Sequence, residues 1–241
     1  MSGQALDQDL IDKISSSILS IKDLYGVVIA TAIVWDYSTT EVFLLTNYHT
    51  WAVDEFKYCF PPSKTKKETL KRKKSGQDPE RLTLSSGDFE HTFVVTSEVF
   101  QFYEKEEDFA VLKFPINGFT MPKIPVRLDV FVTLKVHAFG YIGHTSQFNI
   151  SSGEVSSMIP EGFTMNLLSA GGFSGAAIIA DTFGRAVGYM GGNLDASKEN
   201  NSQHQSYGFR FDRVITVTKR QLFPTKPQLG KGSSCGGKAT K

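Results

Sequence analysis

The amino-acid sequence predicts an all-β fold in two halves, each a barrel or a sandwich of short strands. Segments rich in β-branched and aromatic residues recur along the chain with turn-forming residues between them. Gly, Pro and Asn cluster at residues 115–125, which divides these segments into two groups. Many short strands separated by turn signals are typical of barrels and sandwiches.

The first element that we expect is an amphipathic helix. Leu6, Leu10, Ile14 and Ile18 recur at four-residue steps, and the helix is expected to end within residues 22–26. Its apolar stripe is interpreted as core packing, with docking of a partner as the alternative. Strands are expected at residues 27–35, 41–46, 81–84, 91–96 and 109–114 in the first half, and at 130–140, 147–158, 164–168, 176–179, 186–190 and 207–211 in the second.

Two polar segments interrupt or end this pattern. Residues 61–79 contain seven Lys and Arg residues between Lys64 and Lys74. We interpret this run as a solvated insertion loop, because it lacks the interleaved aromatic residues of a nucleic-acid surface. Nucleic-acid binding or nuclear import stays the open alternative. The Lys-, Gly- and Ser-rich residues 224–241 are expected to be a disordered tail.

The composition narrows the classes of protein further. The net charge of +1 indicates no general attraction to nucleic acid or membrane, and no stretch approaches the ~20 apolar residues of a membrane span. The N-terminus lacks a secretory signal pattern. Cys59 and Cys235 could form at most one disulfide, which favours a reducing compartment, so an intracellular and cytoplasmic location is expected over secretion. The histidines show no metal-ligand spacing, so neither a metal nor a cofactor is expected, and the oligomeric state is left open.

Three segments carry residue types that together perform amide hydrolysis. They are Leu-Thr-Asn-Tyr-His ending at His49, Glu-Asp-Phe-Ala-Val-Leu around Asp108, and Gly-Gly-Phe-Ser-Gly-Ala-Ala around Ser174. A serine hydroxyl needs a nearby histidine to take its proton, and the histidine needs a carboxylate to fix its tautomer. The developing oxyanion needs backbone N–H donors, for which Gly172, Phe173 and Ser174 are the candidates.

These segments resemble those of trypsin-like serine peptidases, over residues 27–217. The first segment is similar to the Leu-Thr-Asn-x-His segment of these peptidases. The closest similarity in style is to the disulfide-free HtrA-like branch, which carries Gly-Asn-Ser-Gly-Gly-Pro around its serine. The order His, Asp, Ser is that of chymotrypsin. The resemblance implies two antiparallel six-stranded β-barrels with a short N-terminal helix. It divides the chain into a helical segment at 1–26, a first barrel at 27–115, a linker at 116–122 and a second barrel at 123–223.

The resemblance also implies a substrate pocket. Leu168 would form its floor, and Gly191, Gly192 and Gly208 would lie at open walls. A floor without charge implies cleavage after uncharged, apolar residues. One departure stands out, because Phe173 replaces the Asp or Asn that precedes the serine in the family. Activation by pairing with a new N-terminus is therefore not expected, and the oxyanion hole must be preformed or induced by ligand.

The expected function is a serine endopeptidase that hydrolyses polypeptides through His49, Asp108 and Ser174 and an acyl-enzyme intermediate. Two alternatives remain. One is a catalytically silent trypsin-like fold used as a binding module, which the Phe173 departure keeps open. The other is an α/β-hydrolase esterase using Ser174, Asp195 and His204, whose order fits that fold. The esterase would require parallel βα units, which the strand-rich pattern lacks.

Overall fold

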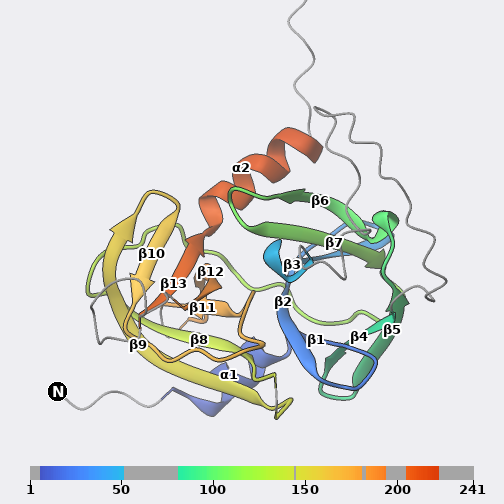
Figure 1. Cartoon of the computed structure of the whole chain (residues 1–241), viewed down its shortest axis with the longest axis horizontal. Helices are drawn as coiled ribbons and strands as arrows, with labels where there is room; N and C mark the ends of the chain where they lie inside the picture. Colours follow the sequence, from blue (N-terminus) through green and yellow to red (C-terminus); the bar gives the residue numbers. More distant parts are fainter. Residues whose placement is uncertain (1–5, 52–80, 144, 181–182, 194–204, 223–241) are drawn as a thin grey trace, which may run out of the picture.

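A computed structural model describes residues 6–51, 81–143, 145–180, 183–193 and 205–222. The described residues form two antiparallel β-units side by side (Figure 1). The basic run Lys64–Lys74 and the tail at 224–241 lie outside the described residues, so the interpretations of these two segments stay predictions.

The first unit is a curled seven-stranded sheet, on the right of Figure 1. In spatial order its strands are β5 (Phe89–Val94), β4 (Arg81–Ser86), β1 (Ile18–Lys22), β2 (Val28–Tyr37), β3 (Glu41–Thr46), β7 (Phe109–Pro115) and β6 (Phe100–Glu104). Short 3-10 turns, η1 (His49–Trp51) and η3 (Ser97–Val99), follow β3 and precede β6. The two-unit β fold is confirmed, although this unit has seven strands and is not a closed six-stranded barrel.

The second unit is a closed six-stranded barrel. Around the barrel its strands are β10 (Gly162–Met165), β13 (Ser206–Arg210), β12 (Ala186–Asn193), β11 (Ala177–Ile179), β8 (Lys135–Tyr141) and β9 (Phe148–Ile159). Every pairing between these strands is antiparallel. Closure of the barrel leaves no unpaired edge within it.

Three apolar clusters hold the molecule together. One lies within the first unit and another within the second. The third joins the two units, because it packs Leu45 and Phe109 of the first unit with Phe139, Tyr189 and Phe209 of the second. The strand ends that border this shared cluster are therefore held in a fixed relation across the two units.

Two helices flank the β-units. α1 (Gln8–Ser15) is capped by the Asp7 carboxylate, which accepts a hydrogen bond from the backbone N–H of Asp9. The helix is shorter than predicted, because Ile18 and Ile21 lie in β1, where strand pairing buries both of them completely. α2 (Phe211–Leu222) follows β13 and was not predicted. Neither helix of the described part is long and apolar enough to cross a membrane.

The topology excludes the esterase alternative. An α/β-hydrolase needs a mostly parallel sheet with a strand–turn–helix unit around its serine. Here Ser174 is followed by β11, a strand of the closed antiparallel barrel. The α/β-hydrolase interpretation is therefore wrong. Its candidates Asp195 and His204 lie outside the described residues.

Candidate active site

The β3–β7 pair brings His49 and Asp108 together. The two strands are antiparallel, with Thr46 opposite Ala110, so the residues after the end of β3 lie next to those before the start of β7. The backbone N–H of Tyr48 donates to the carbonyl of Asp108 at 3.2 Å. His49 then begins η1, and Asp108 ends the turn that leads into β7. Two segments that are 59 residues apart thus meet at one end of the sheet.

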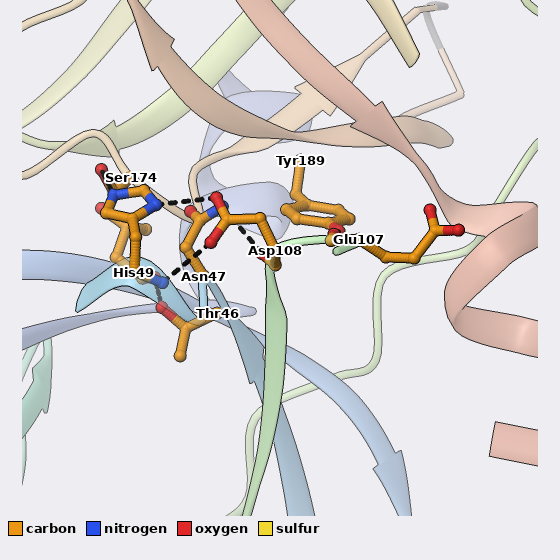
Figure 2. Close-up of polar contacts among 8 residues, drawn as sticks. Thr46, Asn47, His49, Glu107, Asp108, Ser174 and Tyr189 are labelled. Carbon is orange, nitrogen blue, oxygen red and sulfur yellow. Dashed lines mark hydrogen bonds and ion pairs between the residues drawn. The ribbon is translucent and has the colours of Figure 1, made fainter. Parts of the chain in front are cut away.

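His49 hydrogen-bonds both other members of the predicted triad (Figure 2). Its Nδ1 lies 2.7 Å from Oδ2 of Asp108, and its Nε2 lies 2.9 Å from Oγ of Ser174. The His49 side chain is 45% exposed, whereas that of Asp108 is 14% exposed. The His49 ring is thus accessible from solvent, while the Asp108 carboxylate bonded to it is largely screened from water.

Asp108 is fixed by three further contacts. The backbone N–H of His49 donates to its Oδ1 at 2.8 Å, and the side-chain amide of Asn47 donates to its Oδ2 at 3.0 Å and to its carbonyl oxygen at 3.2 Å. Its backbone has φ of +45°, a left-handed conformation that Asp tolerates better than most residues. Asn47 is completely buried and was not among the predicted site residues. Its place in the Leu-Thr-Asn-Tyr-His motif was the only signal for it.

Ser174 lies on a tight turn of the second unit that β2 of the first unit holds in place. The backbone N–H of Thr31 donates to the carbonyl of Ser174 at 2.8 Å, and the Thr31 hydroxyl donates to the carbonyl of Gly172, also at 2.8 Å. The approach is so close that a Cβ on Gly175 would stand 2.2 Å from the carbonyl oxygen of Thr31. Gly175, at φ of +85°, must therefore be glycine.

Phe173 anchors this turn from inside. Its side chain is 2% exposed and packs in the apolar cluster of the second barrel. The residue that departs from the family pattern therefore performs a packing role. An apolar side chain fixes the turn here, with no ion pair required.

The backbone N–H groups of the turn differ in their availability. The N–H of Phe173 donates to the carbonyl of Ala170 at 3.1 Å, so it is already used. The N–H groups of Gly172 and Ser174 have no backbone acceptor within the described residues. The carbonyl of Gly171 accepts from Gly143 at 2.6 Å, and in a trans peptide the adjoining Gly172 N–H points the opposite way. Of the three predicted oxyanion donors, Gly172 and Ser174 are therefore the two whose N–H groups are not used by another backbone carbonyl of the described residues.

An open cleft of about 510 Å³ adjoins the triad residues. Besides the three triad residues, its lining consists of Tyr48, Lys105, Gly191, Gly192, Tyr207 and Phe209. Two of the residues predicted for the substrate pocket, Gly191 and Gly192, thus line this cleft.

The other two predicted pocket residues, Leu168 and Gly208, lie elsewhere. Leu168 is 72% exposed and is not part of the cleft lining. A side chain so open to water cannot form a pocket floor, and this expectation is corrected. The α-carbon of Gly208 faces the barrel interior, because a Cβ there would stand 2.4 Å from Ile178 Cδ1 and 3.2 Å from Met165 Cε. The alternation of side chains along β13 places Tyr207 and Phe209 on the cleft side.

A buried tyrosine supports the loop that carries Asp108. The hydroxyl of Tyr189 donates to the carbonyl of Glu107 at 2.8 Å, and Figure 2 shows its ring beside the two acidic residues. Burial raises the pKa of Tyr189 well above its usual value, and the neighbouring carboxylates Asp108 and Glu107 raise it further. Tyr189 is thus a neutral donor that fixes the acidic loop to the second barrel.

Comparison with known proteins identifies the fold. No protein-family model matches the chain, and no curated protein sequence matches it. Among solved structures, the serine endoprotease of Yersinia pestis has a TM-score of 0.63 at 11% identity, covering 92% of this chain and 68% of that one. An inactive serine-to-alanine mutant of Rv3671c from M. tuberculosis has a TM-score of 0.60 at 15% identity, covering 94% and 99%.

A third similar structure, Deg5, has a TM-score of 0.60 at 17% identity, covering 92% of this chain and 100% of that one. Two of these structures are wholly covered or nearly so, and the match extends over both β-units of this chain. The chain therefore has the fold of the trypsin-like serine peptidases.

Proposed function

We propose that this protein is a serine endopeptidase that hydrolyses polypeptides through Ser174, His49 and Asp108. The observation that carries the proposal is the continuous hydrogen-bonded chain from Ser174 Oγ through the His49 ring to Asp108, at the edge of an open cleft. Nucleophile, base and orienting carboxylate stand within the distances that proton transfer requires. One of the similar structures, that from Yersinia pestis, is described as a serine endoprotease, which supports the same class.

The proposed reaction proceeds in two steps. Ser174 Oγ attacks the substrate carbonyl while His49 Nε2 takes the hydroxyl proton, and the Gly172 and Ser174 N–H groups stabilise the oxyanion. The imidazolium returns this proton to the leaving amine as the C–N bond breaks, which leaves an acyl-enzyme. Water then attacks the ester, with His49 again taking and returning one proton, so that the acid product leaves and Ser174 is restored.

We further propose that the residue on the acyl side of the scissile bond is uncharged. The cleft wall is aromatic, with Tyr48, Tyr207 and Phe209. Among the described residues that line the cleft, the one carboxylate is Asp108, which is already hydrogen-bonded to His49. Lys105, which lines the same cleft, would repel a substrate Lys or Arg. An intracellular location stays a prediction from the low cysteine content.

Labelling with a fluorophosphonate probe tests the mechanism. The folded wild-type protein is expected to react at Ser174 and to cleave an unfolded protein such as reduced casein. Ser174→Ala must abolish both labelling and cleavage, and His49→Ala must reduce both rates. A folded protein that neither labels nor cleaves would overturn the proposal and favour the binding-module alternative, in which the cleft binds a peptide segment without hydrolysing it.

A further inference from the structure

Tyr207 occupies the part of the cleft that glycines alone would leave open. It lies on β13 opposite Gly192 of β12, and the pairing of these strands is bulged between Met190 and Gly192, so Gly191 stands out of register. A Cβ on Gly191 would stand 2.2 Å from Cε2 and 2.6 Å from Cδ2 of Tyr207. The Tyr207 ring thus lies directly against bare backbone.

The same ring extends over the next residue. A Cβ on Gly192 would lie 3.5 Å from both Cε1 and the hydroxyl of Tyr207. One edge of the ring therefore covers Gly191 and the other reaches Gly192. The two glycines line the cleft and also make room for the tyrosine ring, so part of the space beside them is already filled.

The ring is braced and cannot turn aside easily. Tyr207 packs edge-to-face on Phe209 with ring centroids 5.5 Å apart, and Phe209 stacks on Tyr189 at 5.4 Å. Tyr189 is almost completely buried and is bonded to the carbonyl of Glu107. This aromatic ladder, Tyr207–Phe209–Tyr189, runs from the cleft wall to the loop that carries Asp108. A packed row of rings moves only if its neighbours repack.

The ring is also uncharged. Burial raises the pKa of Tyr207, and the nearby Asp108 carboxylate raises it further. At neutral pH the residue is therefore a neutral, bulky wall beside the catalytic groups. Because the ring lines the same cleft as Ser174, it takes up volume that a large substrate side chain would need, whereas a methyl or hydroxymethyl group needs much less.

We propose that Tyr207 sets the size of substrate side chain that this cleft accepts, so that small, uncharged residues such as Ala and Ser are preferred on the acyl side of the scissile bond. This inference rests on the proposed peptidase function and narrows it. Within the uncharged residues, selection is by volume, and the Tyr207 ring is the element that selects.

A series of peptides that differ only in the acyl-side residue tests the proposal. Wild-type kcat/KM is expected to be at least about 10-fold higher for Ala than for Phe, the scale of discrimination that a closely packed pocket gives. Tyr207→Ala should reduce or invert this ratio, because the space of the ring becomes available. Tyr207→Phe is the matched control, since it keeps the ring and should keep the ratio. If Tyr207 had only a structural role, Tyr207→Ala would instead lower kcat/KM for the Ala and the Phe peptide by the same factor.

Each remaining outcome is decisive. A wild-type protein that cleaves after Phe or Leu as fast as after Ala overturns the proposal without any variant, even if Tyr207→Ala fails to fold. An unchanged Ala-to-Phe ratio in folded Tyr207→Ala also overturns it. Fluorophosphonate labelling of Ser174 separates the two levels of failure. Labelling together with the wrong size preference refutes only the role of Tyr207, whereas absence of labelling and of all cleavage refutes the peptidase itself.

Discussion

The anchoring of the Ser174 turn by Phe173 gives a quantitative prediction. Phe173 is 2% exposed within the second barrel core, so Phe173→Ala removes a fully packed ring. Such a change costs about 3–5 kcal/mol of unfolding free energy, from lost burial plus the cavity left behind. Domains typically have about 5–15 kcal/mol in total, so the variant is expected to fold at low temperature with a much reduced margin.

The same substitution should lower catalysis by more than its effect on folding explains. In the proposed mechanism the N–H groups of Gly172 and Ser174 must lie about 2.7–3.1 Å from the oxyanion, and the loss of one such donor costs on the order of 10²–10³ in kcat. A turn freed from its anchor holds these donors less well, so kcat should fall by about 10-fold or more at full folding.

The assay combines urea denaturation with a measurement of kcat at urea concentrations well below those at which the protein unfolds. Leu84→Ala is the matched control, because Leu84 is completely buried in the first unit and makes no part of the turn. It is expected to lose about 2–5 kcal/mol with little change in kcat. Equal kcat in the two variants at equal folded fraction would refute the anchoring argument.

Three further predictions concern the triad and its surroundings. Asp108→Asn should lower kcat on the order of 10⁴-fold by favouring the wrong His49 tautomer, and Ser174→Ala should remove turnover while leaving the denaturation curve in place; turnover like that of wild type in either variant contradicts the triad. Asn47→Ala removes a charge-assisted hydrogen bond to Asp108 and should reduce kcat by about 10- to 150-fold, measured beside Asp108→Asn; the effects of the two changes should be non-additive, and strict additivity would speak against their contact. Burial among aromatic rings lowers the pKa of His91 below its usual 6.5, so as the pH falls His91 is protonated in the unfolded chain before it is protonated in the folded one, and the free energy of unfolding decreases below about pH 6.5. His91→Phe should make the free energy of unfolding depend less on pH in this range. An unchanged slope would contradict a role of His91 in the pH dependence.

Much of the fold could be predicted from the sequence, because strand-forming residues and turn residues alternate along it. The secondary-structure prediction failed where the same pattern of apolar residues fits both a helix and a buried strand. Ile14 and Ile18 continue a helical period, yet Ile18 begins a strand that is buried on both faces, and a strand of that kind has no period of its own. Phe211 was expected to end a strand and instead begins α2.

The three chemistry-bearing residues could be located because each lies in a short local motif. Their surroundings could not, because those contacts join residues far apart in the chain. Thr31 reaches Gly172 across 141 residues and looks in sequence like any other strand threonine. The error at Leu168 has a similar cause: counting back from the serine gives a position in the chain, but the side chain faces water. Tyr207, which lines the cleft and was not predicted, is the immediate neighbour of the predicted Gly208, on the opposite face of the same strand.

The relay spans two β-units, so its geometry depends on what fixes one unit relative to the other. β3 ends just before His49, and the C-terminal half of β2, from Ile33 to Tyr37, is paired with β3. The same β2 holds the Ser174 turn through Thr31, whose carbonyl in turn accepts the hydroxyl of Thr46 at 2.8 Å. Thr31 is therefore bonded on one side to the turn that carries the nucleophile and on the other to the strand that leads to the base. One buried residue therefore ties Ser174 to the strand that leads to His49, in addition to the apolar cluster that the two units share. These contacts explain how a chain with no disulfide among its described residues keeps His49 and Ser174 within hydrogen-bond distance.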